Sequence, residues 1–348
     1  MDGTRSAPRR AATVKDVARA AGVSIASVSR VINGTGPVAQ ATRQRVTDAI
    51  ARLRYVPHGG AASLVKRRHG VVGLLLPALP AEPFAELVRG IEETARRQGR
   101  LLLVARIPDD DGESLRTVAG LKGHVDGLLC MAPHLDTGAL ARLLPEDLPT
   151  VLMGTHATAD QGACVIDNRG AVLELMGHLK HTGCRVVAHI AGPAGNHDAG
   201  EREHAWREAL ARYWPGVEAP LFRGDFEEAS GYAAGCAIAR LETRPDAVFA
   251  ANDLMAAGAM RALLEAGLSV PGDVAIAGFD DIPLASLLRP ALTSVHVDVA
   301  ELGRRALARL LEVIEQPELS RERIEPVRPT LVVRASTGAA GAPTDSRV

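Results

Sequence analysis

Short apolar runs alternate with amphipathic helical segments over most of the chain, from residue 71 onward. The first two runs, VVGLLL and LLLVARI, are separated by a helical segment at residues 84–99. Apolar runs of strand length that alternate with helices are typical of parallel α/β sheets, whose strands are buried on both faces. A second series of similar length starts with ACVIDN at residues 163–168. The body of the chain therefore predicts an α/β core of two Rossmann-like parallel-sheet lobes.

Polar side chains stand at the ends of several of these strands. Asn252 follows the run DAVFAA, Asp280 follows VAIAGF, and Arg202 is expected to begin a helix after the loop GPAGNHDAGE. Since open parallel sheets bind ligands at the carboxyl ends of their strands, these side chains predict a ligand cleft between the lobes. Phe84 is a further candidate for this cleft. The alternative for each residue is a strand-end cap or a solvated loop position.

The first 57 residues follow a different pattern, that of short helices. Thr13 and Asp16 have the spacing of a capping box, which predicts the start of a helix. Gly22 can end this helix in the left-handed conformation, and Ser24 can cap a second helix only two residues later. Two short helices joined by a tight glycine-containing turn form a helix-turn-helix. A third amphipathic segment at residues 41–53 completes a small all-α domain.

Charge separates this head from the rest of the chain. Residues 1–69 contain 13 Lys and Arg against three acidic residues, a net charge of +10, whereas the remaining residues contain 27 basic and 38 acidic side chains. A basic head on an acidic body indicates a polyanionic partner for the head. The alternative is that the charge run is only a solvated face.

The outward face of the second helix fits DNA recognition. Ile25 and Ala26 at its N-terminus can enter a major groove, and Arg30 can pair with guanine. Ser27 and Ser29 suit phosphate contacts, as does the positive end of the helix dipole. The alternative is a helix hairpin that only packs against a partner. Since one such motif reads few bases, we expect a homodimer on a pseudo-palindromic double-stranded DNA operator.

The head closely resembles that of LacI-family transcriptional regulators, with YVP at residues 55–57 and ASLV at residues 62–65, and the resemblance continues to about residue 336. It implies that Ile25 and Ala26 tune the choice of operator and that Arg30 reads a base. It also implies that Leu64 lies on a hinge helix that forms on DNA and wedges into the minor groove, where an apolar side chain can kink the duplex. The candidate DNA-binding residues are Thr13, Ser24, Ile25, Ala26, Ser27, Ser29, Arg30, Asn33, Tyr55, Ala61 and Leu64.

The same resemblance implies a core of periplasmic-binding-protein type, in which the chain crosses between the lobes three times. Arg202, Asn252 and Asp280 would hydrogen-bond a small polar effector, most simply a sugar, and Phe226 would stack on it. The expected parts are a disordered basic arm (1–12), the helix-turn-helix domain (13–57), a hinge (58–69), a core (70–336) with its N-lobe at 70–166 and 299–326 and its C-lobe at 167–298 and 327–336, and a disordered tail (337–348).

Several positions depart from the family's usual pattern, among them His58, Ala62 and Ala39 in or near the head. Gly59 and Gly60 each cost a helix about 0.5–1 kcal/mol relative to alanine, which predicts a hinge helix weaker than is typical. Gly154 stands where many sugar-responsive members have an aspartate, and Val299 stands where some have an aromatic residue. A standard pyranose site would therefore lose one hydrogen-bond acceptor and one wall.

Other classes of site find little support in the sequence. His178, His181 and Cys184 have helix-like spacing but lack a fourth ligand nearby in the sequence, so we expect no metal. GxSxG, HExxH and Walker motifs are absent, and we expect no cofactor, although a Rossmann-like enzyme remains an alternative. The four cysteines are widely spaced, as expected for buried free thiols in a reducing cytosol.

We therefore interpret the chain as a cytoplasmic, dimeric transcription regulator, most simply a repressor of genes for carbohydrate uptake or breakdown. A small-molecule effector in the cleft would control it. The longest apolar stretch, residues 71–81, is too short for a bilayer and is broken by proline, so no membrane partner is expected. Within the same class, an activator or a corepressor-dependent repressor that responds to a non-sugar ligand remains open.

Overall fold

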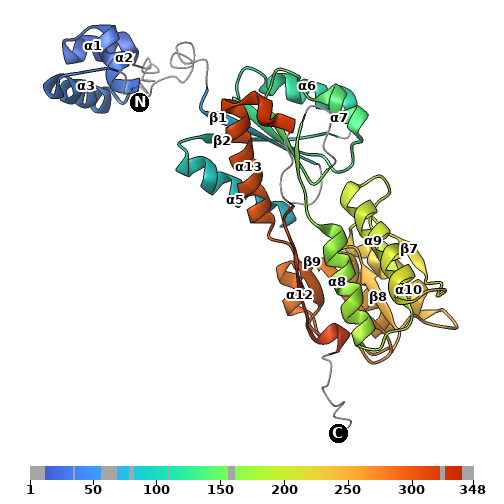
Figure 1. The fold of residues 1–348 in the computed structure, drawn as a ribbon. Helices are drawn as coiled ribbons and strands as arrows, with labels where there is room; N and C mark the ends of the chain where they lie inside the picture. The colour runs from blue at the N-terminus through green and yellow to red at the C-terminus, as the bar shows by residue number, and fades with distance from the viewer. Residues whose placement is uncertain are drawn as a thin grey trace, which may run out of the picture. The chain divides into compact units, whose positions relative to one another are not determined.

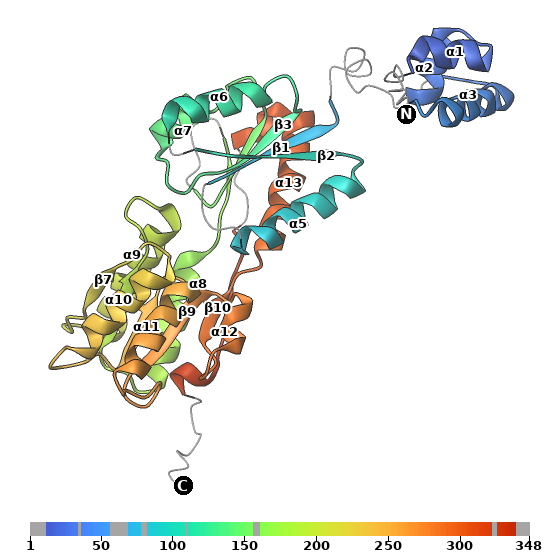
Figure 2. The same cartoon turned by 180° about the vertical axis from the view of Figure 1, so that it is seen from behind.

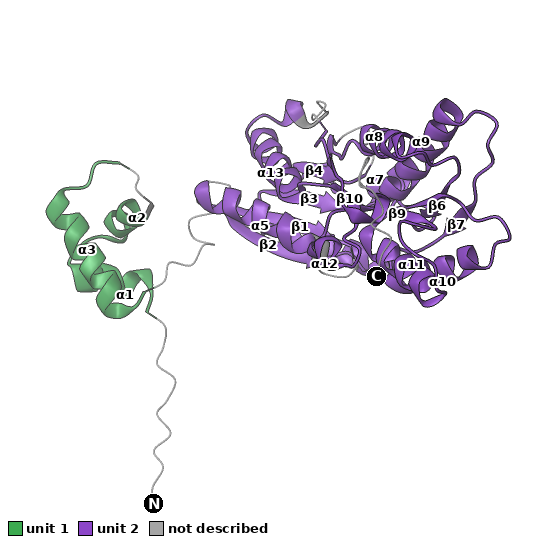
Figure 3. Ribbon diagram, turned by 90° about the horizontal axis from the view of Figure 1, so that it is seen from below, with its two compact units in different colours: residues 1–69 green, residues 70–348 purple. Residues whose placement is uncertain are grey.

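The computed structural model describes residues 12–33, 36–55, 69–77, 82–108, 110–155, 161–321 and 326–338. They belong to two compact units, a small one within residues 1–69 and a large one within residues 70–348 (Figure 3). Most of the expected hinge, including Ala61 and Leu64, lies outside the described residues, as do nearly all of the expected arm and tail. In the described part of the chain, no helix is both long and apolar enough to span a membrane.

Three short helices form the small unit, as the sequence predicts: α1 (Val14–Ala21), α2 (Ile25–Asn33) and α3 (Gln40–Leu53). The capping box of α1 is present, because Thr13 N–H donates to Asp16 Oδ2 over 2.9 Å and Asp16 N–H donates to Thr13 Oγ1 over 3.3 Å. Gly22 ends α1 with a left-handed φ of 63°, and Ser24 Oγ accepts the backbone N–H of Ser27 in the first turn of α2. The unit closes around a small aliphatic core to which each helix contributes a fully buried valine.

The N-lobe of the large unit is a five-stranded parallel sheet in the order β2-β1-β3-β4-β5 (Figure 1). Its strands are β1 (Val71–Leu76), β2 (Leu101–Arg106), β3 (Gly127–Met131), β4 (Thr150–Met153) and β5 (Ala163–Cys164). Alternate strand side chains face opposite helical layers, one of which consists of α5 (Glu82–Arg97) and α13 (Val299–Glu315) and the other of α6 (Asp111–Leu121) and α7 (Thr137–Leu143). The inner strands are therefore buried on both faces, as the continuous apolar runs predict.

The C-lobe is a six-stranded sheet in the order β11-β10-β9-β8-β6-β7, parallel except for β11, which pairs antiparallel with β10. Its strands are β6 (Val187–Ala191), β7 (Leu221–Arg223), β8 (Ala247–Ala250), β9 (Ala275–Asp280), β10 (Thr293–His296) and β11 (Thr330–Val332). One face packs against α8 (Asn168–His181) and α9 (His197–Tyr213), and the other against α10 (Glu228–Ala239), α11 (Asp253–Glu265) and α12 (Pro283–Leu287). The predicted class, a helix-turn-helix head with a two-lobed α/β core, is confirmed.

The chain passes between the two lobes three times, near residues 166, 297 and 327. Two of these crossings lie side by side, because Ile166 and Val327 form a parallel bridge and Asp167 N–H donates to the carbonyl of Val327 over 2.9 Å. The remaining crossing, near residue 297, joins β10 directly to α13 (Figure 2). The last α-helix of the N-lobe therefore follows all strands of the C-lobe except β11 in the sequence. Each lobe is therefore built from separate stretches of chain.

The C-lobe extends one residue further than the sequence indicates. Thr337, which we expected to begin the tail, is buried at the end of the short 3₁₀ helix Ala335–Thr337. Its hydroxyl lies 2.9 Å from His178 Nε2 and 2.8 Å from the hydroxyl of Thr293. All four cysteines are free thiols, and three are buried as predicted, but Cys236 is only half-buried.

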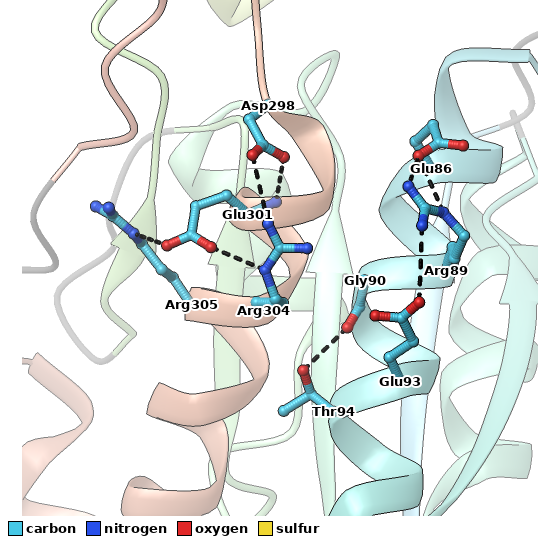
Figure 4. A network of polar contacts seen from close by, with 9 residues as sticks. All are labelled: Glu86, Arg89, Gly90, Glu93, Thr94, Asp298, Glu301, Arg304 and Arg305. Atoms are coloured by element: carbon cyan, nitrogen blue, oxygen red, sulfur yellow. Dashed lines mark hydrogen bonds and ion pairs between the residues drawn. The ribbon is translucent and has the colours of Figure 1, made fainter.

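Helices α5 and α13 approach each other through glycines. A Cβ atom at Gly90 would lie 2.3 Å from the carbonyl oxygen of Ala300, and one at Gly303 would lie 2.8 Å from that of Leu87. Figure 4 shows that each helix carries its own ion pairs beside this contact, such as Arg304 with Glu301 on α13. Since half-exposed pairs within one helix contribute little, the contact depends mainly on the close backbone packing.

We expect Gly90→Ala to lower the free energy of unfolding by about 1–3 kcal/mol, because the added methyl group forces α5 away from α13. The matched control is Gly120→Ala on α6, where the new methyl group has no atom within 4 Å apart from its chain neighbours and the adjacent backbone of its own helix. Alanine there is expected to stabilise the protein by up to about 1 kcal/mol through helix propensity. Chemical denaturation of both variants measures the difference, and equal effects would contradict the packing argument.

Candidate DNA-binding face and effector cleft

Helix α2 presents a face suited to DNA. Ile25, Ala26 and Arg30 are exposed, whereas Val28 on the other side of the helix is fully buried in the core of the small unit. Ser27 and Ser29 are half-buried beside this face. The helix therefore offers small side chains at its N-terminus with one arginine a turn further along, an arrangement that can enter a major groove.

Three other candidates of the small unit have structural roles. Thr13 Oγ1 donates to Asp16 Oδ2 over 2.7 Å, Ser24 Oγ belongs to the cap of α2, and Tyr55 packs half-buried against the aliphatic core. Their contacts with DNA stay predictions. The side chain of Asn33 lies outside the described residues, like the hinge positions already named.

All five predicted effector residues line one cavity between the two lobes, with a volume of about 250 Å³. Phe84 comes from α5 of the N-lobe, and the other predicted residues come from the C-lobe. The further residues that line the cavity include Met131, Pro133, Asn196, Asp198, Glu227, Asp281, His296 and Val299. Residues that are far apart in the sequence thus meet at the carboxyl ends of the strands, as the topology requires.

Arg202 is the best-anchored polar residue of the cavity. It is 4% exposed, its Nε donates to Asn168 Oδ1 over 2.9 Å, and its Nη1 donates to the carbonyl of Ala251 over 2.6 Å. Its Nη2 lies 3.4 Å from Asp280 Oδ1, and the guanidinium is stacked 3.7 Å from the centre of the Phe279 ring. These contacts fix the guanidinium in one orientation before any ligand binds.

The predicted helix start at Arg202 is wrong. Helix α9 begins at His197, because Asn196 caps it by accepting the backbone N–H of Ala199 on Oδ1 over 3.0 Å. Asparagine is among the strongest N-caps, and it ends the loop five residues earlier than we expected. Arg202 consequently lies in the second turn of the helix.

The backbone beside Arg202 is held in a conformation that most residues avoid. Phe226, Asp280 and Asp281 have φ angles of 73°, 98° and 55°, and they are three of the four non-glycine residues with left-handed φ in the described part of the chain. Such conformations cost about 1–3 kcal/mol each and cluster at functional sites. Their concentration at one cavity supports its assignment as a binding site.

Asn252 combines the two roles that the sequence left open. Its Oδ1 accepts the backbone N–H of Met255 and so caps α11, while its Nδ2 donates to the carbonyl of Phe226 over 2.8 Å. The residue is therefore a strand-end cap that also holds the strained Phe226 at the cavity.

Asp253, which follows Asn252, is a buried carboxyl group. Burial and then the charge of Asp280 raise the pKa of Asp253 well above its ordinary value. The Asp253 carboxyl accepts the backbone N–H of Ile282 and the hydroxyl of Ser294.

Comparisons with known proteins agree with this geometry. One family model, bacterial regulatory proteins of the lacI family, matches residues 13–58, and another, a periplasmic binding protein-like domain, matches residues 176–337. The ribose operon repressor of Escherichia coli (strain K12) is 36% identical over 333 residues, which cover 93% of this chain and 99% of that protein. The chain belongs to the LacI family. The HTH-type transcriptional repressor PurR of Mannheimia succiniciproducens is 35% identical over 330 residues, 93% of this chain and 98% of that protein.

Solved structures of LacI-family proteins share the fold. The lac repressor dimer bound to operator and the anti-inducer ONPF matches with a TM-score of 0.87 at 28% identity, over 95% of this chain and 100% of that chain. The transcriptional regulator CelR in complex with cellobiose matches with a TM-score of 0.71 at 34% identity, over 93% of this chain and 99% of that chain. The resemblance found in the sequence is therefore confirmed. The family consists of DNA-binding transcriptional regulators.

The LacI-family fold also brings residues to the cavity that the sequence analysis did not select. Asn196 and Asp198 lie in the loop that we had quoted for Arg202, and Asp281 directly follows Asp280. His296 ends β10, a four-residue strand without a distinct pattern, and its Nδ1 lies 3.3 Å from Asp281 Oδ2. Nothing in the loop marked Asp198 as a cavity residue, because we expected the helix to begin only at Arg202.

Proposed function

We propose that this LacI-family protein is a ligand-responsive repressor of genes for carbohydrate uptake or breakdown, acting in the cytoplasm on a pseudo-palindromic operator. One observation carries the proposal: the chain joins a basic helix-turn-helix unit with an exposed Arg30 to a two-lobed core whose mostly apolar cavity contains a few polar side chains, among them Arg202 and Asp280. The names of its relatives, which include a ribose operon repressor, the lac repressor on its operator and a cellobiose complex, support it. We propose no catalytic role for the cavity.

The chemistry of the cavity supports a sugar effector. Arg202 can donate and Asp280 can accept hydrogen bonds, while Phe84 and Phe226 offer apolar surfaces to the carbon skeleton of a sugar. The volume of about 250 Å³ lies just below the roughly 300–1,000 Å³ that is usual for ligand pockets, which favours an effector of monosaccharide size.

The DNA-binding part of the proposal is tested by selecting the purified full-length protein against randomised duplex DNA without ligand. We expect enrichment of a pseudo-palindrome whose half-sites lie about one helical turn apart. If no sequence is enriched, the selection is repeated with candidate ligands, because glycine disfavours helix, and the sequence therefore predicts that a hinge helix containing Gly59 and Gly60 would need a corepressor to fold. Failure under both conditions would contradict the proposal.

The effector part of the proposal is tested with Asp280→Asn. Asparagine tolerates the left-handed φ of 98° and keeps the shape of the side chain while removing its charge. A hydrogen bond to a charged group contributes about 1.5–3 kcal/mol, so we expect effector affinity to fall about 10- to 150-fold. Operator affinity without ligand should stay unchanged. Gel-shift titrations with operator and a panel of sugars measure both quantities, and a retained response would place the ligand elsewhere.

The proposed dimer has a candidate surface on the large unit. Leu101, Leu103 and Val104 on the edge strand β2 are 70%, 41% and 46% exposed, and Leu287 on α12 is 69% exposed. Strand β2 and helix α12 lie on the same side of the large unit, left in Figure 1 and right in Figure 2. A patch that spans both lobes on one side suits an isologous interface, in which the same surface of two copies pairs about a two-fold axis.

We expect Leu103→Asp to convert dimers into monomers. Burying a carboxylate without a partner in an apolar interface costs several kcal/mol, so the dimer dissociation constant should rise at least about 100-fold. Leu115→Asp on α6 is the matched control, since Leu115 is 49% exposed on a helix that is not part of this patch. Sedimentation velocity at micromolar concentration distinguishes the two variants. An undisturbed dimer in Leu103→Asp would exclude the β2 edge as the interface.

A further inference from the structure

Asp198 reaches from one lobe to the other across the cavity. It lies in the first turn of α9 in the C-lobe, is 9% exposed and lines the cavity. Its Oδ1 accepts a hydrogen bond from Asn168 Nδ2 over 2.8 Å. Its Oδ2 lies 3.4 Å from the position that a Cβ atom of Gly154 would occupy in the N-lobe. A carboxylate from the C-lobe therefore lies beside Gly154, the position at which the sequence predicts that the site lacks an acceptor.

The orientation of Asp198 is fixed by a hydrogen-bond chain along the cavity. Asn168 donates from Nδ2 to Asp198 and accepts from Arg202 Nε on Oδ1, so its amide cannot be flipped without losing both bonds. Arg202 in turn pairs with Asp280. This series of contacts thus runs from Asp198 through Asn168 and Arg202 to Asp280. The two carboxylates are therefore linked through the single positive charge of Arg202.

The balance of charge at the cavity is negative. Arg202 is the sole Arg or Lys among the described residues that line it, and its contact is with Asp280 rather than with Asp198. Burial raises the pKa of Asp280, Arg202 opposes this rise, and the charge of Asp198 adds to it. The carboxylates of Asp198 and Asp280 therefore repel each other. Of the five acidic residues that line the cavity, Glu86 and Asp281 pair with Arg89 and Arg334, which lie outside the lining, and Asp280 pairs with Arg202. Asp198 and Glu227 remain as the carboxylates for which the described residues show no ion pair.

We propose that Asp198 is a specificity-determining residue of the effector cleft. Its carboxylate supplies a hydrogen-bond acceptor from the C-lobe beside Gly154. It thereby restricts the effector to small polyhydroxylated molecules that carry no negative charge. The proposal rests on the proposed function, because it takes the cavity as the effector site. Hydroxyl and ammonium groups donate to a carboxylate, whereas a phosphate group carries about −1.5 to −2 charges at neutral pH and offers only acceptors. Because Arg202 pairs with Asp280 and not with Asp198, the Asp198 carboxylate repels anionic ligands and attracts ligands that donate hydrogen bonds.

Matched ligands and isothermal titration calorimetry on the full-length protein test this inference. The probes are glucose, glucosamine and glucose 6-phosphate, with galactose, galactosamine, galactose 6-phosphate, ribose and ribose 5-phosphate as further sets. We expect binding in at least one set by the neutral or amino sugar, with its phosphate ester at least about 100-fold weaker. Asp198→Asn should weaken the neutral or amino sugar about 10-fold and reduce the discrimination against its phosphate ester. Asp147→Asn, which removes an exposed carboxylate outside the cavity, should change neither.

Each outcome bears on the inference. A phosphate ester that binds the wild type as tightly as its parent sugar would overturn it and leave the proposed function intact. The same holds if Asp198→Asn folds normally, as judged by thermal unfolding, and binds every probe like the wild type. If Asp198→Asn does not fold, Asp198→Ser, a short polar residue suited to a first helical turn, takes its place. Absence of binding by every probe would overturn both this inference and the carbohydrate class of effector, whereas DNA selection would still test the regulator itself.

Discussion

Replacing Arg202 with methionine is expected to lower the free energy of unfolding by about 3–5 kcal/mol and to abolish the effector response. Breaking a buried ion pair by removal of one partner leaves the other charge uncompensated, and Asp280 would keep its carboxylate at the cavity without the guanidinium. Asn168 and the carbonyl of Ala251 would also lose their donor. Chemical denaturation measures the loss of stability, and sugar titrations measure the loss of response.

Two further variants separate the causes. Arg207→Met lies on the same helix, but Arg207 is 57% exposed and pairs with Glu203 at the surface, so its loss should cost less than about 1 kcal/mol. The double variant Arg202→Met with Asp280→Asn removes both charges and should recover part of the stability. Equal losses for Arg202→Met and Arg207→Met would show that Arg202 does not compensate a buried carboxylate.

Arg30→Ala is expected to weaken binding to the selected operator by about 1–3 kcal/mol, or roughly 5- to 150-fold, and to relax the preference at one base pair in each half-site. The reason is that Arg30 is exposed on the helix whose opposite side, at Val28, is buried in the core, so the substitution removes a side chain that we predict to face the groove without disturbing the fold. Repeating the DNA selection with the variant, together with competition titrations at fixed salt, measures both effects.

A second arginine of the small unit provides the control. Arg19 on α1 is 82% exposed and pairs only weakly with Asp16, so Arg19→Ala should reduce affinity slightly and equally for all sequences. Unchanged base preference in Arg30→Ala, or the same uniform loss in both variants, would remove Arg30 from the role of base reader.

Local signals were sufficient to predict the small unit. A helix start needs a cap, and Thr13, Asp16 and Ser24 supply it within a few residues of the chain; Gly22 ends α1 for an equally local reason. Helix α10 shows the limit of such reasoning, because its sequence EASGYAAGCAIA has no clear amphipathic pattern and we predicted no element there. Its glycines allow α10 to pack closely against α11, because a Cβ atom at Gly231 would lie 2.1 Å from the carbonyl oxygen of Met255 on α11.

The cavity was predictable only in part for a related reason. Asn252 and Asp280 could be selected because they follow recognisable strands, and parallel strands present their carboxyl ends at one edge. Asp198 could not, since its place beside Gly154 depends on where α9 begins and on how the two lobes meet. The left-handed φ angles of Phe226 and Asp281 likewise have no marker in the sequence, because neither residue is a glycine.

The interleaving of the lobes along the chain sets the order in which they can be completed during synthesis. One face of the N-lobe sheet lacks α13, one of the two helices that cover it, until nearly all of the C-lobe has been made. The C-lobe in turn is incomplete until β11 and Thr337 have been made. Domains generally fold from the N-terminus as they leave the ribosome. The helix-turn-helix can therefore fold while the core is still unfinished. A gene that ends before residue 299 would encode a complete DNA-reading domain attached to a core that can receive no signal.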